Sequence, residues 1–205
     1  MYSWHSGDSL CWISFAAKQI NCKLVYYGAG LGGKTTNLEK LCEMASRKAP
    51  ARGKSIPLAT ETGGAPSLDF LPLDFGTVRG FKTRFHLYAV PGQVFHDATR
   101  KRILRGADGV VFVADSQAER MDANLESMEN LQENLREHGC DLMTLPYVLQ
   151  LNKRDLPNVL SVEQLARKLR RKDEPVIEAV ACKGIGIFET LNEVSRLVLA
   201  ELGKE

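Results

Sequence analysis

A glycine-rich segment followed by lysine and threonine is the part of the sequence best suited to binding phosphate. It fits the pattern G-x-x-x-x-G-K-[ST] and reads Gly28-Ala29-Gly30-Leu31-Gly32-Gly33-Lys34-Thr35, with Thr36 next. Glycines let the backbone curl so that successive N–H groups face inward, where side chains would block the phosphates. The Lys34 ammonium can neutralise the terminal phosphates, and the Thr35 hydroxyl can bind Mg²⁺. We therefore predict a P-loop at these residues, with Thr36 included in the nucleotide site.

A second motif, Asn152-Lys153-Arg154-Asp155, follows a predicted strand and so lies at a carboxyl end of the expected sheet. The Asp155 carboxylate can accept hydrogen bonds from the ring N–H and the exocyclic amine of guanine, and the Lys153 stem can lie across the base. Adenine would place a ring acceptor against that carboxylate, which is repulsive. Alone, such a motif is commonly a solvated charged turn. Behind a P-loop it indicates a guanine site.

A third candidate, Ala89-Val90-Pro91-Gly92-Gln93, follows the strand before the helical second half of the chain. The Gly92 N–H can turn towards a γ-phosphate, and Gln93 is placed to orient an attacking water. The alternative is a simple Pro-Gly turn with an exposed glutamine, and spacing alone does not separate the two.

The elements that must hold these motifs alternate along the chain. Strands are expected at residues 22–27, 69–78, 81–90, 109–115, 147–151 and 175–181. Helices are expected at residues 34–47, 125–135, 161–171 and 187–202. Helical crossovers between strands predict an α/β fold, a mostly parallel sheet with helices on both faces. The hairpin at Arg79-Gly80 adds one antiparallel edge strand.

Two segments interrupt this alternation. Residues 1–12 show no clear period and are expected to be a flexible extension, which leaves residues 13–203 as a single nucleotide-binding domain. Residues 48–67 hold six proline and glycine residues, too many for a regular element. A loop of this length inside a compact domain is usually functional or disordered.

Composition excludes several classes of protein. The 205 residues include 27 Lys plus Arg and 25 Asp plus Glu, a net charge of +2, which argues against a large basic face for nucleic acid. With 44% hydrophobic and 25% charged residues, general disorder is excluded, and no run approaches the ~20 apolar residues that span a bilayer. Five scattered cysteines without a C-x-x-C pair, and no secretory signal, predict a cytoplasmic protein without integral membrane association.

In its three motifs the chain resembles the Ras-like small GTPases, which have the P-loop NTPase fold. More closely, it is similar to the bacterial MglA-type GTPases of gliding motility and cell polarity. The stretches that carry this are QINCK at 19–23, FLPLD at 70–74, GFKTRFHLY at 80–88, VPGQVF at 90–95 and NKRDLP at 152–157. The resemblance covers about residues 10–202.

The resemblance implies a switch that binds GTP or GDP with Mg²⁺ and hydrolyses GTP slowly. Lys34, Gly92 and Gln93 would be catalytic, and the loop at Glu178-Ala179-Val180-Ala181 would bring Ala181 and Cys182 to the base. Loops around 48–67 and 89–100 would be ordered by the γ-phosphate. Expected partners are effectors of polarity or motility and an MglB-type activating protein of the roadblock fold. Val94 and Phe95 are candidate contacts, with core packing as the alternative.

Departures from the family pattern bear on catalysis. Most Ras-like proteins have Asp, and MglA-type proteins usually Thr, where this chain has Ala89. Asp69 is the candidate to hold the magnesium's water shell instead, unless it only caps a strand. The family's first switch carries an Arg-Thr pair, resembling a built-in arginine finger and a metal ligand. Counted from Thr60-Glu61, those positions are Gly64 and Ala65.

An arginine finger is worth roughly 10³ to 10⁵ in rate. Intrinsic hydrolysis should therefore be slow unless a partner, or Arg52, supplies the cation. The alternative function is a GTP-binding interaction module with little or no hydrolysis. A third possibility, a P-loop kinase or ATPase, is disfavoured because the motif at residues 152–155 suits guanine and not adenine. The basic run at residues 167–172 is usually a solvated face and, less often, a patch for an acidic partner or anionic lipid.

Overall fold

The computed structural model describes residues 12–48, 69–91 and 97–203. Seven strands form one sheet: β1 (Trp12–Ser14), β2 (Gln19–Tyr27), β3 (Asp69–Val78), β4 (Phe81–Ala89), β5 (Gly109–Asp115), β6 (Tyr147–Asn152) and β7 (Val176–Glu178). The α-helices are α1 (Lys34–Lys48), α2 (Asp97–Leu104), α3 (Met121–Glu137), α4 (Val162–Leu169) and α5 (Ile187–Leu202). Short 3₁₀ turns η2 (Ala118–Arg120) and η3 (Ala181–Lys183) precede α3 and α5.

The sheet has the order β3-β4-β2-β5-β6-β7. Pairing is parallel from β4 through β7 and antiparallel between β3 and β4, which confirms the mostly parallel sheet with an antiparallel edge. The hairpin turn has positive φ at both Arg79 (49°) and Gly80 (83°), the combination of a type I′ turn that suits the twist of the two strands.

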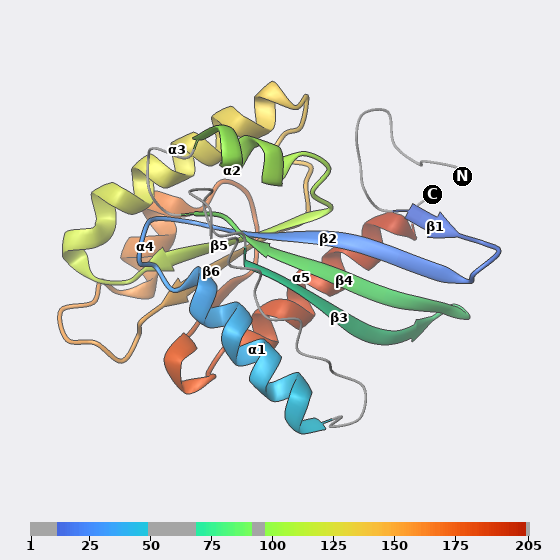
Figure 1. Cartoon of the computed structure of the whole chain (residues 1–205). Coiled ribbons are helices and arrows are strands. Elements are labelled where there is room, and N and C mark those ends of the chain that lie inside the picture. The colour runs from blue at the N-terminus through green and yellow to red at the C-terminus, as the bar shows by residue number, and fades with distance from the viewer. Residues whose placement is uncertain (1–11, 49–68, 92–96, 204–205) are drawn as a thin grey trace, which may run out of the picture.

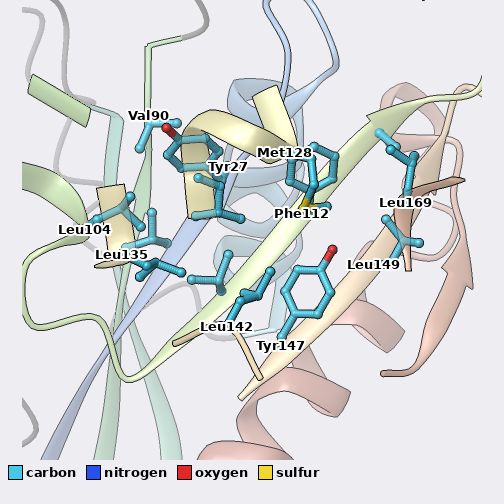
Figure 2. Packing of buried hydrophobic residues seen from close by; sticks show 14 of the residues in the cluster. Tyr27, Val90, Leu104, Phe112, Met128, Leu135, Leu142, Tyr147, Leu149 and Leu169 are labelled. Atoms are coloured by element: carbon cyan, nitrogen blue, oxygen red, sulfur yellow. The ribbon is translucent and has the colours of Figure 1, made fainter. Parts of the chain in front are cut away.

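Helices cover both faces of the sheet, as predicted. Helices α1 and α5 pack on one face, and α2, α3 and α4 lie on the other (Figure 1). Strand β5 is buried along its whole length, because both faces are covered. Figure 2 shows the core under α3, where Phe112, Met128 and Tyr147 are completely buried.

Two elements were not expected from the sequence. Strand β1 pairs antiparallel with Gln19–Asn21 of β2. This part of β2 is open to β1 because β5, on the same side of β2, pairs only with Leu24–Tyr27. Helix α2 begins at Asp97, inside the segment expected to be a loop, and three of its eight residues are basic. Its weak apolar pattern explains why periodicity did not reveal it.

The predicted start of α4 is confirmed by its capping geometry. The Ser161 hydroxyl accepts from the Gln164 N–H, and the Gln164 side chain accepts from the Ser161 N–H. The basic run beyond it is partly structural: Lys172 donates to the Leu145 carbonyl at 2.6 Å, and buried Glu174 accepts from the backbone of Arg171 and Lys172.

Register brings the three sequence motifs to one end of the sheet. Tyr27, the last residue of β2, pairs with Phe112, and Asp115 at the end of β5 pairs with Asn152 at the end of β6. On the other side of β2, the Val90 N–H just after β4 donates to the Tyr26 carbonyl at 3.0 Å. No helix in the described part of the chain is long and apolar enough to cross a membrane.

Candidate nucleotide-binding site

The glycine-rich segment forms the connection between β2 and α1. At two of its positions a side chain is excluded both by a steric clash and by a positive φ. Gly28 has φ +140°, and a Cβ there would lie 2.3 Å from the Val113 carbonyl oxygen. Gly33 has φ +102°, and its Cβ would lie 2.2 Å from Asn152 Nδ2. Any side chain at either position would push the loop away from β5 or from the guanine motif.

Three carbonyls of the loop accept hydrogen bonds from side chains that lie outside the motif. Gly30 accepts from Arg120 Nη2 at 2.7 Å, and Gly32 from Asn152 Nδ2 at 2.8 Å. Gly33 accepts from Asn37 Nδ2 at 2.9 Å. Because the carbonyls are bound on the protein side, the loop favours the conformation in which its N–H groups are available to a phosphate.

Lys34 lies inside this loop and is almost fully buried, at 5% exposure. Its ammonium donates to the carbonyls of Gly28 (2.8 Å) and Ala29 (2.7 Å), which hold the charge at the phosphate cradle. Thr35, one residue on, is exposed, and Thr36 is half-buried in the first turn of α1.

The oxygen donors here fit Mg²⁺, which keeps several waters and usually takes only one or two protein ligands besides the substrate's phosphates. Thr35 would supply its hydroxyl. In the β3–β4 ladder Asp69 pairs with Ala89, the position at which most Ras-like proteins are expected to carry an acid. Among the described residues no group of three His, Cys, Asp or Glu forms a separate metal site.

The guanine motif is joined directly to the phosphate loop. Besides binding Gly32, Asn152 accepts through Oδ1 from the Ala181 N–H at 2.9 Å. One buried amide therefore ties the P-loop to the predicted base-contacting loop, where Ala181 is buried and Cys182 exposed. Lys153 adopts φ +65° and its ammonium lies 2.6 Å from Asp115 Oδ2.

Asp155 lies partly exposed, 2.9 Å from the Lys183 ammonium. The hydrogen bond from Lys183 lowers the pKa of the Asp155 carboxyl below its ordinary value, so the group stays a carboxylate. A carboxylate is the form that accepts two hydrogen bonds from guanine.

The third motif is described only up to Pro91. Buried Arg100 of α2 donates to the Pro91 carbonyl at 3.1 Å and to Asn130 of α3 at 2.9 Å, which fixes where this segment leaves the sheet. The other predicted residues of the two switch segments lie outside the described residues: Gly92, Gln93, Val94 and Phe95, and also Arg52, Gly64 and Ala65.

Several residues that shape the site were not predicted. Asp115 and Arg120 contact the lysine of the guanine motif and the P-loop, and Asn37 pairs with buried Gln150 through two amide hydrogen bonds of 3.0 and 2.9 Å. Gln150 in turn binds Thr190 of α5 at 2.9 Å. Polar residues inside an otherwise apolar strand, as at Gln150, are the signal that could have identified this network.

Comparison with known proteins agrees with this geometry. Residues 65–198 match the model of the ADP-ribosylation factor (Arf) family. Over 195 residues the chain is 56% identical to the mutual gliding-motility protein MglA of Myxococcus xanthus (strain DK1622), covering 95% of this chain and 99% of that protein. The chain belongs to the MglA-type small GTPases. An MglA-type GTPase binds guanine nucleotide and hydrolyses GTP, which is the chemistry that a P-loop beside an N-K-x-D motif can support.

Proposed function

We propose that this GTPase is a cytoplasmic switch that regulates gliding motility or cell polarity. The observation that carries the proposal is 56% identity along nearly the full length of a protein named for gliding motility, combined with a complete P-loop and guanine motif. GTP would order the two switch segments through γ-phosphate contacts, and hydrolysis would release them to change which effectors bind.

We propose roles for the site residues as follows. Lys34 and the P-loop backbone bind the phosphates, Thr35 and Asp69 hold Mg²⁺ and its water shell, and Gln93 orients the attacking water with the Gly92 N–H at the γ-phosphate. Asn152, Lys153, Asp155, Ala181 and Cys182 form the base site. Mg²⁺ would neutralise charge that develops on the phosphates.

Hydrolysis by the protein alone should be slow, because Gly64 and Ala65 stand where the family carries arginine and threonine. A roadblock-fold protein of the MglB type is the proposed activator. The test is single-turnover GTP hydrolysis with and without that partner, on the wild type and on Gln93→Ala. Slow turnover that the partner raises, and that Gln93→Ala abolishes, would support the proposal.

Arg52→Ala serves as the companion variant in that assay, because Arg52 is the arginine of the first switch segment and could replace the missing one. Loss of GTP hydrolysis in Arg52→Ala would mean that this chain supplies the catalytic cation. Unchanged hydrolysis would mean that the partner supplies it. Tight GTP binding without turnover in every condition would overturn the switch and favour the second candidate, an interaction module stabilised by nucleotide.

A further inference from the structure

Arg120 lies between the two halves of the nucleotide site without belonging to either motif. Its Nη2 donates to the Gly30 carbonyl of the P-loop at 2.7 Å, and its Nε lies 3.8 Å from Asp115 Oδ2. The same carboxylate oxygen is 2.6 Å from the ammonium of Lys153, the lysine of the guanine motif. A guanidinium, a buried carboxylate and an ammonium therefore link the phosphate loop to the base site.

The carboxylate at the centre of this link is completely buried, whereas the Arg120 and Lys153 side chains are 33% and 28% exposed. A buried carboxylate is stable only when cations and hydrogen-bond donors surround it. Asp115 meets this need with Lys153, Arg120 and the Gln117 N–H at 3.2 Å. It therefore fixes the direction in which Arg120 can point.

The backbone that carries Arg120 is held as firmly as its side chain. Asn124 of α3 exchanges two hydrogen bonds with the backbone of Asp115, at 3.0 and 2.8 Å. The turn η2 is tied to the loop after β6, since the Ala118 N–H donates to the Asn158 carbonyl at 3.2 Å. These hydrogen bonds fix the start of α3 relative to the ends of β5 and β6. Arg120 therefore reaches the P-loop from a backbone that is held in place.

We propose that Arg120 is a positioning residue for the P-loop, which holds the Gly30 carbonyl away from the cradle so that the neighbouring N–H groups face the β-phosphate. Arg120 binds the outer side of the loop, so it acts through the loop and not by touching the nucleotide. Its positive charge next to the cradle also favours a bound polyphosphate. The inference rests on nucleotide binding at the P-loop and is independent of the motility role.

This role predicts an effect that depends on the number of phosphates in the ligand. GDP places two phosphates in the loop and GMP only one, whereas both carry the same base. In Arg120→Ala the dissociation constant for GDP should rise about tenfold, the effect of losing one charge-assisted hydrogen bond, while that for GMP changes less than about twofold. Both constants are measured by isothermal titration calorimetry on the full chain.

Two further variants serve as controls. Arg120→Lys keeps the charge and should recover most of the GDP affinity, and Arg136→Ala removes an exposed arginine at the far end of α3 and should change neither constant. Equal losses of GDP and GMP affinity in Arg120→Ala would overturn the proposal, since they would mean a general loosening of the site. Unchanged GDP affinity would overturn it too. If the wild type bound no guanine nucleotide, the assignment of the site itself would fail instead.

Discussion

Single residues of this site serve two partners at once. Asn152 donates to the P-loop carbonyl of Gly32 and accepts from the N–H of Ala181, so it ties the P-loop to the predicted base-contacting loop. Asp115 pairs with Lys153 and Arg120. A motif such as N-K-x-D is thus only the part of the network that would touch nucleotide, and the residues behind it are dispersed through the sequence.

Asp155 should determine which base is bound. Asparagine at this position would present one donor and one acceptor in place of two acceptors, which suits xanthine, whose C2 carries an oxygen, and not guanine. We expect Asp155→Asn to weaken GTP binding at least about 100-fold and to improve binding of xanthosine triphosphate. Competition of the two triphosphates against a fluorescent GDP analogue measures both effects. Retained preference for GTP would contradict the assignment of Asp155 to the base.

At the scale of elements, β2 contributes opposite faces to two different cores. Tyr26 packs towards α1 and α5, and Tyr27 towards α2 and α3, and both side chains are completely buried. The Tyr27 hydroxyl donates to Asn130 and accepts from Asn134 at 3.1 Å. The Tyr26 hydroxyl has no hydrogen-bond partner among the described residues, and burial raises the pKa of Tyr26 so far that it stays neutral.

These neighbouring tyrosines form a matched pair for stability measurements. Tyr27→Phe should lower the free energy of unfolding by about 1–2 kcal/mol, because it removes two hydrogen bonds of a completely buried hydroxyl, one donated to Asn130 and one accepted from Asn134. Tyr26→Phe should be neutral or stabilising by up to about 1 kcal/mol, because it removes an unsatisfied buried hydroxyl. Denaturant unfolding of both variants in the nucleotide-free protein tests this. Equal destabilisation by the two substitutions would contradict the difference in hydrogen bonding between the two tyrosine hydroxyls.

Most regular elements could be predicted from the sequence, because β5 is a continuous apolar run and the helical periodicity is strong at α3 and α5. The P-loop and the guanine motif were found because their chemistry depends on adjacent residues. Strand β1 and helix α2 were missed, since one is three residues long and the other is largely polar. Arg120 was missed because its role depends on where β5 ends relative to the P-loop, which is a property of the folded chain.

At the scale of the whole molecule, the described residues bring the P-loop and the N-K-x-D motif together at one end of the sheet. The two segments expected to respond to the γ-phosphate come before β3 and after β4 in the sequence, and most of their residues lie outside the described ones. We propose that nucleotide binding is intact while catalysis lacks two groups, because Gly64 and Ala65 stand at the positions expected to carry the family's arginine and threonine. Binding and hydrolysis should therefore be separable in this protein.

The separation of binding from hydrolysis is tested by single-turnover GTP hydrolysis of the wild type beside the double variant Gly64→Arg with Ala65→Thr. Both proteins should bind GTP with similar affinity. Without a partner, the wild type should hydrolyse it slowly, and the double variant should be faster by about 10³, the lower value for an arginine finger. Adding Gln93→Ala to the double variant should remove the gain. A wild type that hydrolyses GTP as fast as the double variant without a partner would show that Gly64 and Ala65 do not limit catalysis.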